Sequence, residues 1–450
     1  MQKWFLALFA LLITLSLPGC EDAPSEKMTE AFPAPVYRWG TVRDRTLVLW
    51  GNREDLQRPY LASAFDRYRE MTGNTVRIES FSHQELAERL EAAFSGGGTA
   101  EQPDLLLSFG GVNIEHLDPD AHFYDFTAAP WVDDLTDTAL NQTLFNGKVI
   151  GLPYWEASVS GILYNKDLFR QYGIDVPRTQ RAFLDACEKL LRQGVTPVYL
   201  PFAEPTMLLY QFPMDSILRD QRVLDALNEG RLNYAELPGM GDIVDWYRTM
   251  AERGYFGSAY ANNGWNGMDP AMRGGRYAMM ICWDTWLYTD FTGDPSRFGI
   301  MPAFMGVPEQ GTFEGPNLAL LIANRHSPRL DAAVDLVTFM ADPYNYNVTL
   351  AGLYTAPVFK NQIGSVSTPQ YIEKQQEIEQ LFCDSTAWTR VRGFSQADAA
   401  YIQRHMLEPG YDTEACLRDM DASRINRAGP PPVPDAAASG TQRKDVPRAE

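Results

Sequence analysis

Residues 147–201 read GKVIGLPYWEASVSGILYNKDLFRQYGIDVPRTQRAFLDACEKLLRQGVTPVYLP, where strand and helix patterns follow one another closely. Residues 145–153 and 158–164 are rich in apolar and β-branched residues and predict two adjoining strands. Thr179 then predicts the cap of a helix that ends before Gly194. The apolar face of this helix comprises Phe183, Ala186, Cys187, Leu190 and Leu191. Strands followed by a capped amphipathic helix predict an α/β unit.

A similar pattern precedes this stretch. Three runs predict buried strands, and two amphipathic helices separate them. The strands are expected at 46–50, 75–80 and 104–109, and the helices at 61–71 and 83–94. Strands and helices that alternate at this spacing predict a parallel, doubly wound sheet. Later strands are expected at 276–282, 297–301 and 317–322.

The first twenty residues have the pattern of an export signal. Lys3 precedes an apolar run from residue 4 to residue 17, which is shorter than a membrane-spanning helix needs. Residues 17–20 (LPGC) resemble a bacterial lipobox, in which Cys20 would carry the lipid after cleavage. The alternative is a plain signal peptide with an incidental cysteine. We therefore expect a signal peptide at 1–19 and a tether at 20–45.

The charge of the chain bears on its partners. The 450 residues carry a formal charge of −19, which repels phosphate backbones, so we expect no nucleic-acid partner. Cys383 and Cys416 share the C-terminal part and are the expected disulfide if one forms. His116 and His122 lie near three aspartates, but their spacing matches no known cation site, so we expect a solvated acidic loop. No metal or cofactor is expected.

A resemblance to a known family rests on short motifs that occur in the family's order. They are GLPY at 151–154, LYNK at 163–166, YG at 172–173, VP at 176–177 and GVTP at 194–197. Residues 276–286 resemble a late strand that places an indole in the ligand site, and residues 352–357 resemble a later crossing between lobes. Over residues 46–425 the sequence resembles the family 1 extracellular solute-binding proteins of bacterial ABC importers, the maltose-binding-like group.

The resemblance implies an α/β fold of two doubly wound lobes joined by crossing strands, as in type II periplasmic binding proteins. Residues 46–150 and about 303–350 are expected in the N-lobe, and 151–302 and about 351–427 in the C-lobe. Residues 428–450 lack a periodic apolar pattern and are expected to be disordered. The resemblance also implies a monomer that is exported and anchored by lipid to the membrane. Its expected protein partners are the permease subunits of an ABC importer, to which it would deliver its ligand.

A sugar-binding site of this kind needs aromatic faces, carboxylates and amides. Each candidate also has an alternative role as a packing or capping residue. Of Trp283 and Trp286 we expect one to pack and one to stack on the ligand. The candidates are Trp50, Asn52, Glu54, Phe109, Gly110, Trp155, Glu156, Trp265, Trp283, Asp284, Trp286, Tyr354 and Trp388.

The expected function is a non-catalytic receptor that captures a neutral mono- or oligosaccharide by lobe closure. One alternative is an exported glycoside hydrolase, because carboxylate separation is not visible in a sequence. Another is a binding protein of the same fold for a cation or another polar solute.

Overall fold

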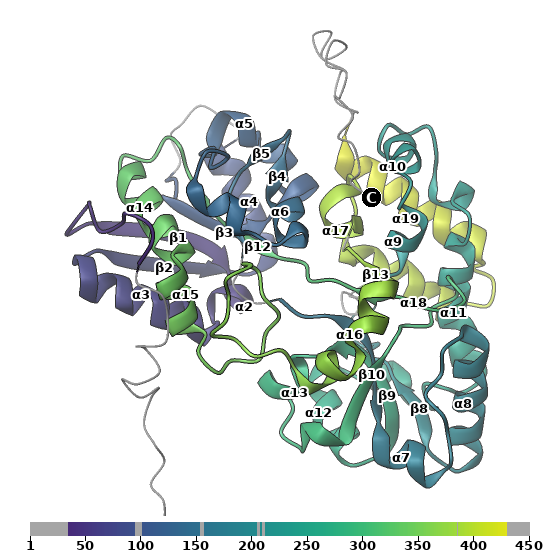
Figure 1. Cartoon of the computed structure of the whole chain (residues 1–450). Helices are drawn as coiled ribbons and strands as arrows, with labels where there is room; N and C mark the ends of the chain where they lie inside the picture. Colours follow the sequence, from purple (N-terminus) through teal and green to yellow (C-terminus); the bar gives the residue numbers. More distant parts are fainter. Residues whose placement is uncertain are drawn as a thin grey trace, which may run out of the picture.

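The structure is a computed structural model, and it describes residues 35–94, 101–153, 157–204, 208, 212–384 and 386–429. The expected signal peptide, Cys20, most of the tether and nearly all of the expected C-terminal tail lie outside these residues. Across the described ranges, no helix has the length and apolarity that a membrane crossing requires. Two sheets, each covered by helices, form two lobes (Figure 1).

The sheet of the first lobe has the order β2-β1-β3-β12-β6. Its strands are β1 (Thr46–Asn52), β2 (Thr75–Phe81), β3 (Leu105–Phe109), β6 (Leu152–Pro153) and β12 (Ala319–Ala323). β1 pairs in parallel with β2 and β3, as expected, but β12 is antiparallel to β3 and β6 is antiparallel to β12. β12 runs antiparallel because the chain re-enters this lobe beside the end of β3. Ala319, the first residue of β12, therefore pairs with Phe109, the last residue of β3.

Helices cover both faces of this sheet because alternate strand residues point to opposite sides. Leu47 and Leu49 belong to the core cluster that includes residues of α3 and α14, whereas Val48 belongs to the cluster under α4. The longer elements of this lobe are α3 (Pro59–Thr72), α4 (His83–Phe94), α6 (Asp137–Thr143), α14 (Leu330–Ala341) and α15 (Pro343–Thr349). The shorter ones are α2 (Arg53–Leu56), η1 (Gly111–Leu117), α5 (Pro119–His122), η2 (Pro130–Asp134) and the hairpin of β4 (Leu144–Phe145) and β5 (Lys148–Val149).

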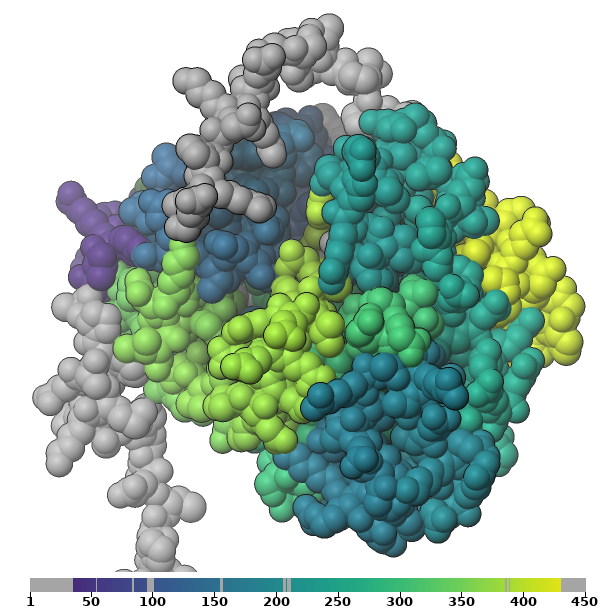
Figure 2. Space-filling view, turned by 45° about the vertical axis from the view of Figure 1, so that its right-hand side comes forward, coloured from purple at the N-terminus to yellow at the C-terminus, as the bar shows by residue number. Residues whose placement is uncertain are grey.

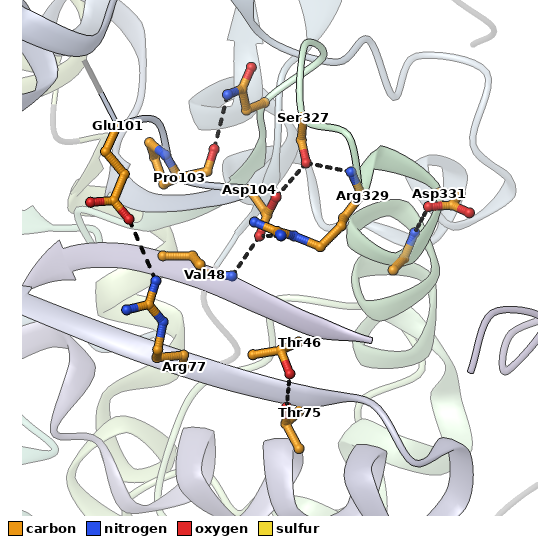
Figure 3. A network of polar contacts seen from close by, with 12 residues as sticks. Thr46, Val48, Thr75, Arg77, Glu101, Pro103, Asp104, Ser327, Arg329 and Asp331 are labelled. Carbon is orange, nitrogen blue, oxygen red and sulfur yellow. Dashed lines mark hydrogen bonds and ion pairs between the residues drawn. The ribbon is translucent and has the colours of Figure 1, made fainter. Parts of the chain in front are cut away.

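A buried carboxylate ties the strands of this lobe to α14 (Figure 3). The side chain of Asp104 is 1% exposed, and its Oδ2 accepts hydrogen bonds from the Val48 amide at 2.7 Å and from Arg329 Nε at 2.9 Å. Its Oδ1 accepts a hydrogen bond from the Ser327 hydroxyl. Asp104 therefore links β1 and β3 to the loop that follows β12.

The sheet of the second lobe has the order β13-β11-β7-β9-β8, with β10 also paired to β7. Its strands are β7 (Ser160–Asn165), β8 (Thr196–Tyr199), β9 (Tyr277–Trp283), β10 (Phe298–Met301), β11 (Phe313–Glu314) and β13 (Phe382–Cys383). Its longer helices are α8 (Gln180–Arg192), α10 (Gln221–Asn228), α11 (Met240–Glu252), α16 (Pro369–Leu381), α18 (Ala399–Leu407) and α19 (Thr413–Ala428). The shorter ones are α7 (Lys166–Gln171), α9 (Met214–Ile217), α12 (Met268–Arg273), α13 (Trp286–Thr289) and α17 (Thr386–Arg390).

The expected lobe boundaries need correction at three places. β6 pairs with β12 and Ala157 packs in the core of the first lobe, so the chain leaves this lobe after Ala157 and not after residue 150. Phe304 packs in the core of the second lobe and Glu314 of β11 pairs with Ser160 of β7, so the chain returns to the first lobe after Glu314 and not near residue 303. Val358 and Phe359 pack in the core of the first lobe, although residues from about 351 were assigned to the second. The crossing segments are too short for a periodic pattern, so their ends could not be read from the sequence. One of these crossings follows α15, and Figure 2 shows its yellow-green residues between the two lobes.

The expected disulfide is wrong. Cys383 and Cys416 are both free and buried, as are Cys187 and Cys282. Cys383 lies in β13, where its Sγ accepts a hydrogen bond from Arg219 Nη2 at 3.0 Å. Cys416 lies in α19, and its Sγ is 3.8 Å from Sδ of Met420. The two cysteines share a part of the sequence but belong to separate elements.

Candidate functional site

A cavity of about 570 Å³ lies between the two lobes. The first lobe supplies residues at the start of α3, the second lobe supplies α13 and its neighbours, and the crossing chain supplies residues after α15. The lining residues are Gln57, Arg58, Pro59, Tyr60, Tyr288, Thr289, Asp290, Leu350, Gly352, Leu353, Tyr354 and Thr355. A ligand in this cavity would therefore touch both lobes and the connection between them.

Two tyrosines form the aromatic part of the cavity wall. The rings of Tyr288 and Tyr354 stack with centroids 3.9 Å apart and an angle of 29° between their planes. The Tyr288 hydroxyl donates to Gln370 Oε1 at 2.9 Å, and burial raises the pKa of Tyr288 to about 12. Tyr354 is 37% exposed, so part of its surface is open to a ligand.

Two tryptophans form a second aromatic pair at the end of β9. The rings of Trp265 and Trp283 stack with centroids 5.2 Å apart and an interplanar angle of 21°. Both side chains are partly exposed. Glu204, which follows β8, fixes this pair because its Oε1 accepts a hydrogen bond from the Trp265 amide at 2.7 Å. The exposed part of the pair therefore lies beside a carboxylate, although neither indole is among the residues that line the cavity between the lobes.

Asp284 and Trp286 both have structural positions; Asp284 was a candidate for ligand contact, and Trp286 was one of the two tryptophans of which we expected one to pack. Asp284 is 3% exposed, and it accepts hydrogen bonds from the Val159 amide at 2.9 Å and from the Thr368 hydroxyl at 2.5 Å. It thus joins the start of β7, the end of β9 and the N-terminus of α16. Burial raises the pKa of this carboxyl from 3.8 to about 6. Trp286 is 1% exposed and packs in the core, so of the two tryptophans Trp283 is the one with an accessible face.

The candidates in the first lobe lie deeper than expected. Trp50 is 2% exposed, and its Nε1 donates to Glu79 Oε2 at 2.8 Å, so it is a packing residue. Asn52 is buried at the end of β1, and Phe109 is half-buried at the end of β3. A Cβ on Gly110 would lie 2.6 Å from Cδ1 of Leu320, so this glycine accommodates neighbouring protein.

Four candidates cannot be placed relative to these aromatic pairs. Trp155 and Glu156 lie outside the described residues, and the side chains of Glu54 and Trp388 do as well. Two residues that the sequence reasoning missed are Tyr288 and Glu204. Both follow the carboxyl ends of strands, a position that favours ligand contact in open α/β sheets, and this signal could have identified them.

The acidic loop near His122 has an ordinary structural role. Asp118 caps α5, and Asp120 forms an ion pair with Lys148 and accepts a hydrogen bond from Asn146 Nδ2 at 2.7 Å. Within the described part of the chain, no group of three or more His, Cys, Asp and Glu side chains has the arrangement of a metal site.

Comparisons with known proteins identify relatives for a large part of the chain. Residues 63–374 match the sequence model of a family described as bacterial extracellular solute-binding protein. The multiple sugar-binding protein of Streptococcus mutans is 34% identical over 107 residues, which are 24% of this chain and 25% of that protein. The melibiose/raffinose/stachyose-binding protein of Bacillus subtilis is 27% identical over 187 residues, which are 41% of this chain and 39% of that protein. The chain thus spans well under half the length of these relatives.

The fold also has counterparts among solved structures. A sugar transporter of Bacillus licheniformis in complex with stachyose superposes with a TM-score of 0.66 at 16% identity, covering 84% of this chain and 99% of that one. A chitin oligosaccharide binding protein superposes with a TM-score of 0.68 at 18% identity, covering 85% and 99%. These likenesses establish the two-lobed fold of a type II binding protein.

Proposed function

The chain belongs to the bacterial extracellular solute-binding protein family, and on that premise we propose that it binds a neutral oligosaccharide between its lobes and delivers it to an ABC importer. In this family role the protein is a receptor, so its task is reversible capture by lobe closure and not chemical conversion.

The observation that carries the proposal is the pair of aromatic stacks, Trp265–Trp283 and Tyr288–Tyr354. Sugar rings have apolar C–H faces and hydroxyl groups around the edge, so they match flat aromatic faces bordered by polar groups. Glu204 borders the tryptophan pair, and Gln57 and Asp290 line the cavity at Tyr354. The curated relatives, whose names state sugar binding, support the same ligand class.

A glycoside hydrolase would need a pair of available carboxylates. Asp284, the acidic candidate beside Trp283, is not available, because its two oxygens accept hydrogen bonds from Val159 and Thr368 inside the protein. The family match favours a receptor over an enzyme.

Export follows from membership of an extracellular family. We extend the proposal to the anchor: Cys20, in the lipobox-like sequence of residues 17–20, would carry the lipid and hold the receptor near the permease subunits. Such a tether keeps the receptor at a high effective concentration beside its importer.

Trp265→Ala should weaken oligosaccharide binding at least about tenfold, a loss near 1.4 kcal/mol, because it removes a flat apolar contact. The free energy of unfolding should change little, since Trp265 is partly exposed. Calorimetric titration and urea unfolding of the same variant separate the two effects.

Trp39→Ala is the matched control for Trp265→Ala. Trp39 is another half-buried tryptophan, but it packs edge-on against Phe339 of α14, in the first lobe. This control should lose stability and keep its affinity. Wild-type affinity in a stable Trp265→Ala variant would remove the tryptophan pair from the site.

A further inference from the structure

The two lobes meet at a second place, formed by η1 of the first lobe and α17 of the second. Figure 1 shows α17 on the side of the second lobe that faces the first. Ile114 and Leu117 of η1 are buried in a first-lobe core, and Ala387 and Val391 are buried in the second-lobe core. A contact between η1 and the α17 region is therefore a contact between lobes.

One ion pair crosses this contact. Arg392 Nε lies 2.8 Å from Glu115 Oε2, and the two side chains are 12% and 30% exposed. Arg392 is also fixed within its own lobe, because its amide donates to Asn228 Oδ1 and its Nη2 donates to the Ala428 carbonyl, both at 2.9 Å. Among the ion pairs formed by described residues, this is the one that joins the two lobes. Both side chains keep some exposure, so a high salt concentration still weakens the pair, although less than it would weaken a fully exposed one.

A close backbone approach lies beside the ion pair. Gly111 has a φ of +62°, and a Cβ at this position would lie 2.1 Å from the carbonyl oxygen of Thr389 in α17. A side chain at residue 111 would therefore push the two lobes apart. Gly110 was a candidate for ligand contact, but at the neighbouring Gly111 the space is taken by the other lobe.

A cavity of about 740 Å³ lies beside this contact, between α4 and η1 of the first lobe and residues 392–395 of the second. The two lobes therefore touch over only part of the surfaces that face each other here. We propose that the Glu115–Arg392 ion pair and the Gly111–Thr389 approach form an interlobe latch, which stabilises the arrangement of the lobes in this structure relative to one in which they lie farther apart. Only the effect of the latch on affinity depends on the proposed function, because the latch itself acts in the unliganded protein.

Glu115→Gln tests the ion pair by small-angle X-ray scattering of the unliganded protein. The radius of gyration should rise relative to wild type at low salt, and 1 M NaCl should move wild type toward the variant while changing the variant little. Glu70→Gln removes a charge from an exposed site in α3 and should scatter like wild type. Identical scattering of wild type and Glu115→Gln would overturn the contribution of the ion pair.

Gly111→Ala tests the backbone approach, and Gly147→Ala is its control. Gly147 also has a positive φ, +78°, but nothing lies within 4 Å of the position of its Cβ. Both substitutions strain the backbone of the first lobe, so similar losses of stability are expected. Only Gly111→Ala should increase the radius of gyration. Equal radii for the two alanine variants would contradict the role of Gly111.

The latch and the proposed function can fail separately. If the protein binds an oligosaccharide, Glu115→Gln should weaken binding about tenfold although Glu115 does not contact the aromatic pairs. If scattering changes as expected and no oligosaccharide binds, the latch stands and the proposed ligand is wrong. If scattering is unchanged, the latch is wrong whatever the protein binds.

Discussion

Asp104→Ala should lower the free energy of unfolding by about 3–5 kcal/mol, because it removes a buried carboxylate that accepts three hydrogen bonds and leaves a buried backbone donor unpaired. The substitution leaves the Val48 amide, the Ser327 hydroxyl and the Arg329 guanidinium without the acceptor that they share. These groups lie at the opposite end of β1 and β3 from the lobe interface, so a folded fraction should keep its ligand affinity. Urea unfolding monitored by circular dichroism measures the loss.

Asp331→Ala is the control for Asp104→Ala. Asp331 lies in the same region and is drawn beside Arg329 in Figure 3, but it is exposed, and its carboxylate accepts a hydrogen bond from the Ala332 amide at 2.8 Å. Surface substitutions of this kind change stability by about 0.5 kcal/mol or less, or by about 1 kcal/mol where a helix cap is lost. Equal effects of the two substitutions would contradict the structural role of Asp104.

The stability of the protein should also depend on pH through Asp284. Burial raises the pKa of this carboxyl from 3.8 to about 6, so between these values the folded protein binds a proton that the unfolded chain has released. The favourable contribution is complete below about pH 4 and is lost as the pH rises through 6. A change of this size corresponds to roughly 3 kcal/mol.

Asp284→Asn isolates this effect, because the amide cannot titrate. The difference in unfolding free energy between the variant and wild type should move in favour of the variant from pH 4 to pH 7 and then stay constant. Chemical unfolding at intervals of half a pH unit gives the two profiles. Parallel profiles would mean that Asp284 does not titrate with a raised pKa.

Local patterns in the sequence predicted most secondary structure correctly. Pro59 and Gly73 mark the ends of α3, and Thr179 caps α8 by accepting a hydrogen bond from the Ala182 amide at 3.1 Å. These signals depend on neighbours in the sequence, so no tertiary information is needed to read them. The type II fold, inferred from the resemblance, is confirmed by the solved structures.

The site was harder to predict because burial depends on contacts between distant segments. Trp50, Trp283 and Trp286 all lie at or just beyond strand ends in the sequence, yet Trp50 and Trp286 are buried and Trp283 keeps an accessible part. The side chain of a strand residue reaches the cleft or the core according to the register and helix packing of the whole lobe. The identity of the accessible tryptophan was therefore left open by the sequence.

The most direct test of the account is calorimetric titration of the protein with neutral oligosaccharides such as raffinose, stachyose and chitin and xylan fragments, followed by chromatography of the recovered sugar. We predict that at least one oligosaccharide binds with one ligand per protein and is recovered intact. At a hundredfold excess over its dissociation constant it should add about 2.7 kcal/mol to the free energy of unfolding. Cleavage of the sugar, or binding of a cation or amino acid in place of every oligosaccharide, would contradict the account.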